Sequence, residues 1–285
     1  SSRASLKVLD QELPETYINR LKAEKPNISA LADETIYELM SITKDGMVTL
    51  SSLLLFCKYP QAYFPQLCIT AVVLPGDDIG DIGGYGERFV DNKRIEGNLP
   101  EMLDQALAFV RKNMRIKTII NPNSGKREDR TDYPIIAVRE ALLNTLVHRD
   151  YSIHTEGMPI QILMYPDRIE IRNPGGIYGR LRVDQLGKMQ PDTRNPVLVT
   201  ALEVMGLTEN RYSGIPTIRR SMKDFNLEDP VFADERGTFT VILYNRDSIR
   251  DNTSQRKMTE KEEELLNFLK IPRSRHEIAE YIGIG

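Results

Sequence analysis

Three polar side chains recur along one face of an otherwise apolar helix in this sequence. In the segment REALLNTLVHRDY, Glu140, Asn144 and His148 stand four residues apart, which places all three on the same helical face. The other faces carry the apolar side chains that can contact a core, namely Leu142, Leu143, Leu146 and Val147. The pattern therefore predicts either a solvent-exposed polar stripe or a site that combines a carboxylate, an amide and an imidazole.

The residues that follow this helix form a regular succession of predicted elements. The helix at 134–150 leads into two strands, a glycine-containing loop, two further helices and a closing strand, at 159–165, 168–172, 173–179, 196–205, 215–225 and 238–244. Residues 133–246 therefore predict one α+β unit in which helices cover a sheet.

The first 132 residues predict a smaller α/β module. Its elements are two helices, a β-branched strand, an amphipathic helix and the start of a hairpin, at 13–25, 31–42, 68–74, 99–114 and 116–120. The apolar run 48–56 fits either a buried strand or a short core helix. The Gly/Asp stretch 77–86 lacks the ligand spacing of a calcium loop and the GxGxxG spacing of a dinucleotide loop, so we expect a flexible loop there.

Composition excludes several classes of protein. The 285 residues include only two cysteines, without CxxC spacing, so neither a zinc site nor a disulfide framework is expected. No apolar run reaches the length of a membrane span, and no signal peptide opens the chain. The net charge of −3 requires any nucleic-acid contact to come from a local patch. We therefore expect a cytoplasmic protein without membrane contacts.

The succession of motifs resembles the GHKL superfamily, which contains the ATPase domains of gyrase, a heat-shock chaperone, histidine kinases and MutL. The first motif of that superfamily, ExxxN, is matched by Glu140 and Asn144, and its two glycine motifs resemble Asn173–Gly176 and Ser213–Ile215. The resemblance implies a Bergerat-like two-layer α/β sandwich with a mixed sheet. It also implies that Glu140 polarises the attacking water and that Asn144 holds Mg²⁺ against the phosphates of ATP.

The same resemblance implies a set of nucleotide contacts, which are Asn144, His148, Asn173, Gly175, Gly176 and Gly214. One position departs from the superfamily. Where an active member has an aspartate that accepts a hydrogen bond from the adenine amino group, this sequence has Arg172 or Asn173, depending on the register of the strand. Arginine cannot accept a hydrogen bond, and an amide accepts one more weakly than a carboxylate. We therefore expect a degenerate nucleotide site.

A narrower resemblance extends over most of the chain. The segments TLSSLLLFCKYPQAYFPQ, NKRIEGNLPEML, EALLNTLVHRDY, RIEIRNPGG, TRNPVL and YSGIPTIRR resemble bacterial proteins described as transcriptional regulators or RecG-like ATP-dependent DNA helicases. Those proteins carry a Schlafen/AlbA-type domain, once called a divergent AAA domain, then a GHKL-like domain and a C-terminal winged helix. The opening residues, SSRAS, resemble the point just after the AlbA-type core, so we expect that core to be absent from this chain.

Two short helices are predicted near the end of the sequence, at 259–269 and 274–282, each opened by a capping box. They fit the first two helices of a winged helix, in which Arg273, Arg275 and His276 would lie beside the DNA backbone. A helical hairpin used for dimer contacts is the alternative.

Other catalytic motifs fit the sequence poorly. His148-Arg149-Asp150 resembles the catalytic loop of protein kinases, but Thr155 stands where that loop needs asparagine, and no DFG motif accompanies it. There is no GxSxG motif, no Cys–His pair and no Walker A lysine motif. These absences argue against a kinase, a hydrolase of those types and a helicase motor.

These observations predict three parts. They are a module at 1–132 that follows an AlbA-type domain, a GHKL-like domain at 133–246, and a linker with a partial winged helix at 247–285. The expected function is a DNA-binding transcriptional regulator, in a homo-oligomer, whose degenerate nucleotide-binding domain acts as sensor or scaffold for ATP and Mg²⁺. The alternative is a Mg²⁺-dependent ATPase associated with a DNA helicase.

Overall fold

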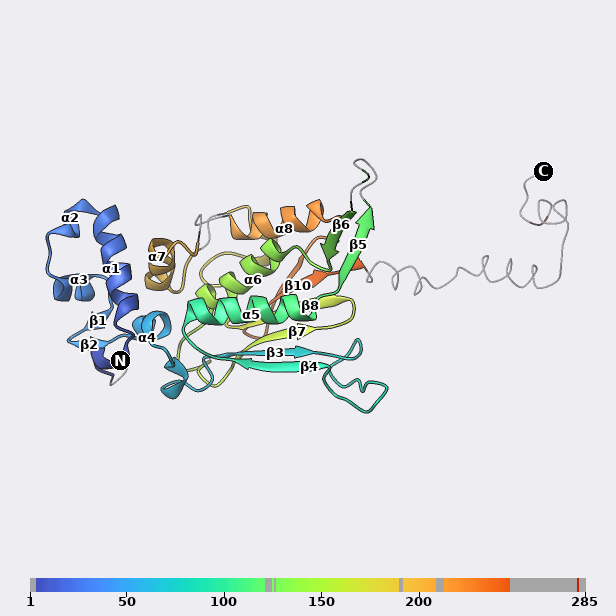
Figure 1. Cartoon of the computed structure of the whole chain (residues 1–285), viewed down its shortest axis with the longest axis horizontal. Coiled ribbons are helices and arrows are strands. Elements are labelled where there is room, and N and C mark those ends of the chain that lie inside the picture. Colours follow the sequence, from blue (N-terminus) through green and yellow to red (C-terminus); the bar gives the residue numbers. More distant parts are fainter. Residues whose placement is uncertain are drawn as a thin grey trace. The chain divides into compact units, whose positions relative to one another are not determined.

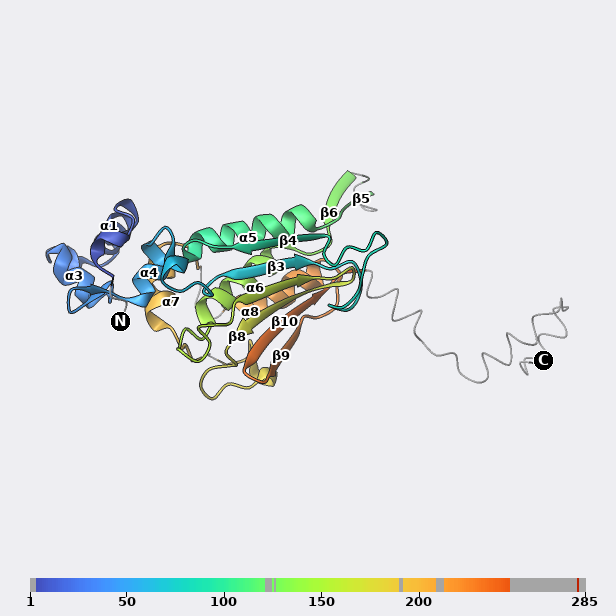
Figure 2. The ribbon, with the colours of Figure 1, turned by 90° about the horizontal axis from the view of Figure 1, so that it is seen from below.

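Six strands form one mixed sheet, and helices α5, α6 and α8 cover one of its faces (Figures 1 and 2). The computed structural model describes residues 4–120, 125, 127–189, 192–208, 213–246 and Tyr281. The chain divides into the units Ser1–Asp247 and Ser248–Gly285, and the fold described below is that of the first. The strand order is β4-β3-β7-β8-β10-β9, with bounds Asp91–Ile95, Ile69–Val73, Ile160–Met164, Arg168–Pro174, Thr238–Tyr244 and Val231–Glu235. This arrangement confirms the predicted two-layer sandwich with a mixed sheet.

One strand pair gives the sheet its mixed character. Strand β3 pairs in parallel with β7, with Ile69 opposite Ile160, whereas the other neighbouring strands of the sheet are antiparallel. A parallel pair needs a long crossover, and here the connection includes β4, α5 and α6. Residues on both sides of position 133 therefore share one sheet, and the division at 132/133 does not separate two sheets.

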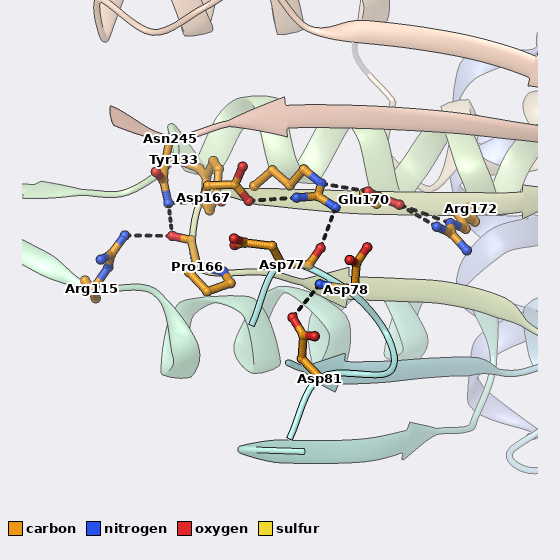
Figure 3. Close-up of polar contacts among 11 residues, drawn as sticks. Asp77, Asp78, Asp81, Arg115, Tyr133, Pro166, Asp167, Glu170, Arg172 and Asn245 are labelled. Carbon is orange, nitrogen blue, oxygen red and sulfur yellow. Dashed lines mark hydrogen bonds and ion pairs between the residues drawn. The ribbon is translucent and has the colours of Figure 1, made fainter. Parts of the chain in front are cut away.

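The alternation of side chains along β8 separates the two faces of the sheet. Ile169, Ile171 and Asn173 are buried on the face that the helices cover. On the opposite face, Glu170 accepts hydrogen bonds from Arg168 at 2.8 Å and from Arg172 at 2.7 Å. Figure 3 shows Glu170 and Arg172 in this row, together with Asp167. Arg172 therefore lies on the face of the sheet that faces away from the helices.

The three covering helices follow from clear local signals. Helix α5, Leu99–Asn113, begins with a capping box in which Asn98 and Glu101 satisfy each other's backbone N–H groups. Helix α6, Ile135–His148, buries its predicted core residues, Leu142, Leu143, Leu146 and Val147. Helix α8, Gly214–Asp224, packs against α6. The line of Glu140, Asn144 and His148 therefore faces away from the main core, as predicted.

The N-terminal part is mainly helical. Its elements are η1 Leu6–Val8, α1 Glu12–Glu24, α2 Pro26–Ser29, α3 Asp33–Leu39, the short strands β1 Thr43–Lys44 and β2 Met47–Val48, α4 Leu50–Phe56 and η2 Pro60–Ala62. The ambiguous run 48–56 is mostly helix α4, because the hydroxyl of Thr49 accepts a hydrogen bond from the N–H of Ser52 and starts the helix. Helix α7, Pro196–Val204, contacts α1 and α4.

The remaining described elements are a hairpin and a short 3-10 helix. The predicted hairpin is present as β5, Ile116–Ile120, and β6, Arg127–Thr131, and η3 spans Val183–Gln185. The predicted helix at 259–269 and, apart from Tyr281, the one at 274–282 lie outside the described residues, as do Arg273, Arg275 and His276. In the part of the chain that the structure describes, no helix has the length and hydropathy that crossing a membrane requires.

Candidate nucleotide-binding site

A cavity of about 130 Å³ lies between α6, α8, β8 and β10. Six residues predicted from the sequence line it together: Asn144, His148, Asn173, Gly175, Gly176 and Gly214. They come from α6, from β8 with the turn that follows it, and from the start of α8. A single water needs only ~10–15 Å³ of such space, so this cavity is large enough for an organic ligand.

Two amide atoms in this cavity are buried without a hydrogen-bond partner among the described residues. They are Nδ2 of Asn144 and Oδ1 of Asn173. Leaving a buried polar atom unpaired costs about 1–3 kcal/mol, so such atoms are uncommon unless a water or a ligand satisfies them. The two atoms mark places where a bound molecule would supply hydrogen-bond partners.

The structure settles which residue of RNPGG faces the cavity. Asn173 is 3% exposed and lines it, whereas the guanidinium of Arg172 lies on the opposite face of the sheet beside Glu170 (Figure 3). In the β8–β10 ladder, Asn173 is opposite Phe239, which also lines the cavity. Of the two residues that the sequence left open, Asn173 is therefore the one whose side chain faces the cavity.

Helix α8 begins very close to the polar face of α6. A Cβ atom added to Gly214 would lie 2.8 Å from Asn144 Nδ2 and 3.2 Å from Glu140 Oε2, so only glycine fits there without a shift. Glu140 does not line the cavity itself, and its Oε1 lies 3.3 Å from Nη1 of Arg139. The structure thus places Glu140 and Asn144 side by side at the N-terminus of α8, where backbone N–H groups favour an anion.

The glycines after β8 are surrounded by protein side chains. Gly175 has a φ of +100°, and a Cβ atom there would lie 2.6 Å from Cβ of Asp150 and would also overlap the guanidinium of Arg194. At Gly176 a Cβ atom would overlap the carboxylate of Asp234, which accepts a hydrogen bond from the N–H of Ile177 at 3.0 Å. These glycines permit close packing of the chain around one wall of the cavity.

The segment His148–Tyr151 positions the end of α6. Arg149 is 1% exposed, and its guanidinium donates to the carbonyl oxygens of Asp150, Thr155 and Met158. The hydroxyl of Tyr151 donates to the carbonyl of Leu146 at 2.7 Å. These contacts within the protein give the kinase-like HRD sequence a structural role.

His148 lies in the wall of the cavity. Burial and the nearby positive charge of Arg194 lower the pKa of His148 below its ordinary value of 6.5. A neutral imidazole has one donor and one acceptor nitrogen. It can therefore hydrogen-bond a ligand without adding charge to the site.

Most of the remaining lining is apolar and was not predicted from the sequence. It includes Ile177, Tyr178, Leu181, Leu186, Met189, Ile215, Ile218, Phe239 and Val241, with Asp192 as an added carboxylate. Apolar residues in loops and strands look like core in a sequence, so their pattern gave no signal. Phe239 and Val241 lie on β10, and the other seven residues follow the NPGG turn or lie near the start of α8.

The residues present fit a magnesium ion that is held mainly by its ligand. Among the described residues there is no group of three or more His, Cys, Asp or Glu side chains that could hold a metal by themselves. Mg²⁺ commonly binds through one or two protein oxygens together with substrate phosphates and waters. Asn144 Oδ1 could supply one such oxygen.

The six-stranded mixed sheet and its covering helices define an α/β sandwich with a cavity against the helices. Residues 157–243 match the family described as "Putative ATP-dependent DNA helicase recG C-terminal". The match covers β7, β8, α7, α8, β9 and β10, and it begins after α6.

A solved structure shows the same fold. It is that of the DIP2311 protein from Corynebacterium diphtheriae, with a TM-score of 0.63 and 18% sequence identity. The similarity covers 86% of this chain and 46% of that protein, so this chain spans about half of its length. No curated protein matches this chain.

Proposed function

We propose that this chain binds a nucleotide in the cavity between α6, α8, β8 and β10. The observation that carries the proposal is the meeting of six predicted contact residues in one cavity with two unpartnered amide atoms. The polar end, at Asn144 and Gly214, suits phosphates, and the apolar walls suit a base. ATP with Mg²⁺ is the proposed ligand, and the ion would neutralise phosphate charge beside Asn144.

Titration calorimetry of the full chain with ADP or ATP and Mg²⁺ tests this proposal. Asn144→Ala should weaken binding by about tenfold or more, because it removes the amide beside the proposed phosphates. Asn92→Ala is the matched control, because Asn92 is an exposed asparagine on the edge strand β4. Absence of binding at millimolar nucleotide would rule out the proposal.

We further propose that the nucleotide domain serves a cytoplasmic, homo-oligomeric transcriptional regulator that binds DNA through Arg273, Arg275 and His276. The support is the sequence resemblance to a winged helix and the family match that names a DNA helicase. Both cysteines are free, and free thiols are usual in a reducing compartment. A gel shift with duplex DNA tests this role. Binding that weakens with salt and is lost in Arg273→Ala/Arg275→Ala would support it, and unchanged binding would contradict it.

ATP hydrolysis is the second candidate function, because Glu140 lies beside Asn144 at the start of α8. In that case the carboxylate would orient the attacking water. Its ion pair with Arg139 opposes this role, because the guanidinium already occupies one of the carboxylate oxygens. Phosphate release that Glu140→Gln abolishes while nucleotide binding persists would establish hydrolysis.

A further inference from the structure

We infer that the hairpin of β5 and β6 is an interface between two copies of this chain, in which the two β5 strands pair antiparallel, edge to edge. This inference specifies a surface for the homo-oligomer proposed above, and it does not depend on nucleotide or DNA binding. It rests on the unpaired edge of β5, on the exposed side chains of that strand and on the symmetry of their positions.

The hairpin extends beyond the end of α5 and is fixed at its base (Figures 1 and 2). On the β5 side, Arg115 forms an ion pair with Asp132 at 3.1 Å and donates to the carbonyl of Pro166 at 3.1 Å. On the β6 side, Arg130 donates to the carbonyl of Asp224 at 3.3 Å, at the end of α8. These contacts hold the two strands in place, so a partner that binds them loses little free energy to ordering the hairpin.

The edge of β5 that faces away from β6 is available for pairing. Among the described residues, β6 is the only strand that pairs with β5. The N–H of Asp132 donates to the carbonyl of Arg115 at 3.1 Å, and bonded residues alternate along an antiparallel ladder, so the odd-numbered residues of β5 bond to β6. The backbone N–H and C=O groups of Ile116, Thr118 and Ile120 therefore point outward, where another strand can bond to them.

These three residues also share one face of the hairpin, and that face is apolar at both ends. Ile116 is 64% exposed and Ile120 is 73% exposed. Between them, the hydroxyl of Thr118 donates to Asp129 at 2.7 Å and accepts from Arg127 at 3.0 Å, so these polar groups are paired within the hairpin. The exposed isoleucines are therefore the part of this face that gains from removal from water.

The spacing of the isoleucines matches a second copy of the same strand. When two copies of β5 pair about a two-fold axis at Thr118, Ile116 of each copy lies opposite Ile120 of the other. Each isoleucine then has a β-branched neighbour across the new pair, while the outward backbone groups bond in the same register. A two-fold interface requires a self-complementary patch of this kind. The equal spacing of Ile116 and Ile120 on either side of Thr118 therefore favours a second copy over an unrelated strand.

Sedimentation equilibrium of the full chain tests the interface. We expect monomer and dimer to exchange at about micromolar concentrations, because a pair of short strands is a small interface. Ile120→Lys should raise the dimer dissociation constant by about tenfold or more, because it replaces an apolar contact with a charge. Ile82→Lys is the matched control, because Ile82 is 64% exposed in the loop between β3 and β4, and it should leave the constant unchanged.

Oxidative cross-linking locates the two-fold axis. Thr118→Cys places two thiols opposite each other, where the Cα atoms of a bonded antiparallel pair are ~5.5 Å apart and a disulfide can form. Asp129→Cys is the control on the same face. Asp129 lies opposite Thr118 on β6, so in the dimer it would be three strand spacings, or ~14 Å, from its copy. A covalent dimer should form with Thr118→Cys and not with Asp129→Cys.

The outcomes separate this inference from the proposals above. A chain that is monomeric up to about 100 µM would overturn both the hairpin interface and the proposed homo-oligomer. A dimer that Ile120→Lys leaves intact, or that Ile82→Lys weakens equally, would overturn the hairpin interface and leave the homo-oligomer standing. Equal cross-linking of the two cysteine variants, or none with Thr118→Cys, would do the same. These results leave nucleotide binding to the calorimetry described above.

Discussion

The guanidinium of Arg194 lies 3.2 Å from the carboxylate of Asp150 and packs against Gly175. Its Nη2 also donates to the carbonyl of Gly176 at 3.3 Å, and its guanidinium carbon lies 5.3 Å from the ring centre of Tyr178. One arginine from the segment TRNP therefore joins the end of α6 to the turn after β8. The shape of the cavity wall depends on this contact.

Substitution of Gly175 tests the packing at this contact. Gly175→Ala should lower the free energy of unfolding by about 2–4 kcal/mol, because it adds a steric overlap to a positive φ. Gly46→Ala is the control, because Gly46 has a φ of +71° but no atom within 4 Å of an added Cβ. It should cost about 1 kcal/mol. Urea denaturation measures both, and equal losses would contradict the proposed overlap.

Removal of the buried guanidinium of Arg149 should destabilise the protein. Arg149→Met would leave the carbonyls of Thr155 and Met158 without this donor, at a cost of about 2–4 kcal/mol. Arg149→Lys should recover only part of the loss, because an ammonium cannot reproduce the planar fork of donors. Thermal and urea unfolding would show this order. A fully stable Arg149→Met would contradict the structural role.

Burial of His148 predicts a pH dependence of stability. Its pKa is lowered in the folded chain, so between the folded and unfolded pKa values the unfolded state binds more protons and stability rises with pH. The contribution is complete above about pH 6.5 and is lost as the pH falls through the lower, folded pKa. His148→Gln should flatten the stability profile below pH 6.5, because it removes the buried imidazole whose pKa is lowered. An unaltered profile in His148→Gln would count against the buried neutral imidazole.

Arg172 and Asn173 form a matched pair of neighbours on opposite faces of the sheet. Arg172→Ala should change the nucleotide dissociation constant by less than about twofold, because its guanidinium pairs with Glu170 away from the cavity. Asn173→Ala should weaken nucleotide binding by about tenfold. Calorimetry on the two variants tests the register of β8 directly. The reverse order of effects would mean that β8 is shifted by one residue in solution.

Most elements of the sandwich could be predicted because their apolar periodicity was clear, as in α5, α6 and β10. Strands β4 and β9 were missed because both lie at the edges of the sheet. Their sequences, DNKRI and VFADE, mix charged and apolar residues, as edge strands commonly do. The parallel pairing of β3 with β7 could not be predicted from local sequence patterns, because it joins residues about 90 positions apart, such as Ile69 and Ile160.

The candidate site was predicted better for its polar residues than for its walls. The spacing of Asn144 and His148 and the NPGG turn identified residues that do meet in one cavity. Phe239 and Ile218 could not be distinguished from core residues, because apolar side chains carry no signature of facing a cavity. The choice between Arg172 and Asn173 needed the strand register, which tertiary pairing sets.

The parallel contact between β3 and β7 has a practical consequence for anyone dividing this chain into fragments. A fragment that begins at residue 133, or at the start of the family match at residue 157, would remove β3 and leave the backbone of β7 unpaired along one side. An open strand edge of that kind, with Ile160 and Ile162 beside it, invites association with other chains. A stretch that keeps β7 paired on both sides must therefore begin before Ile69.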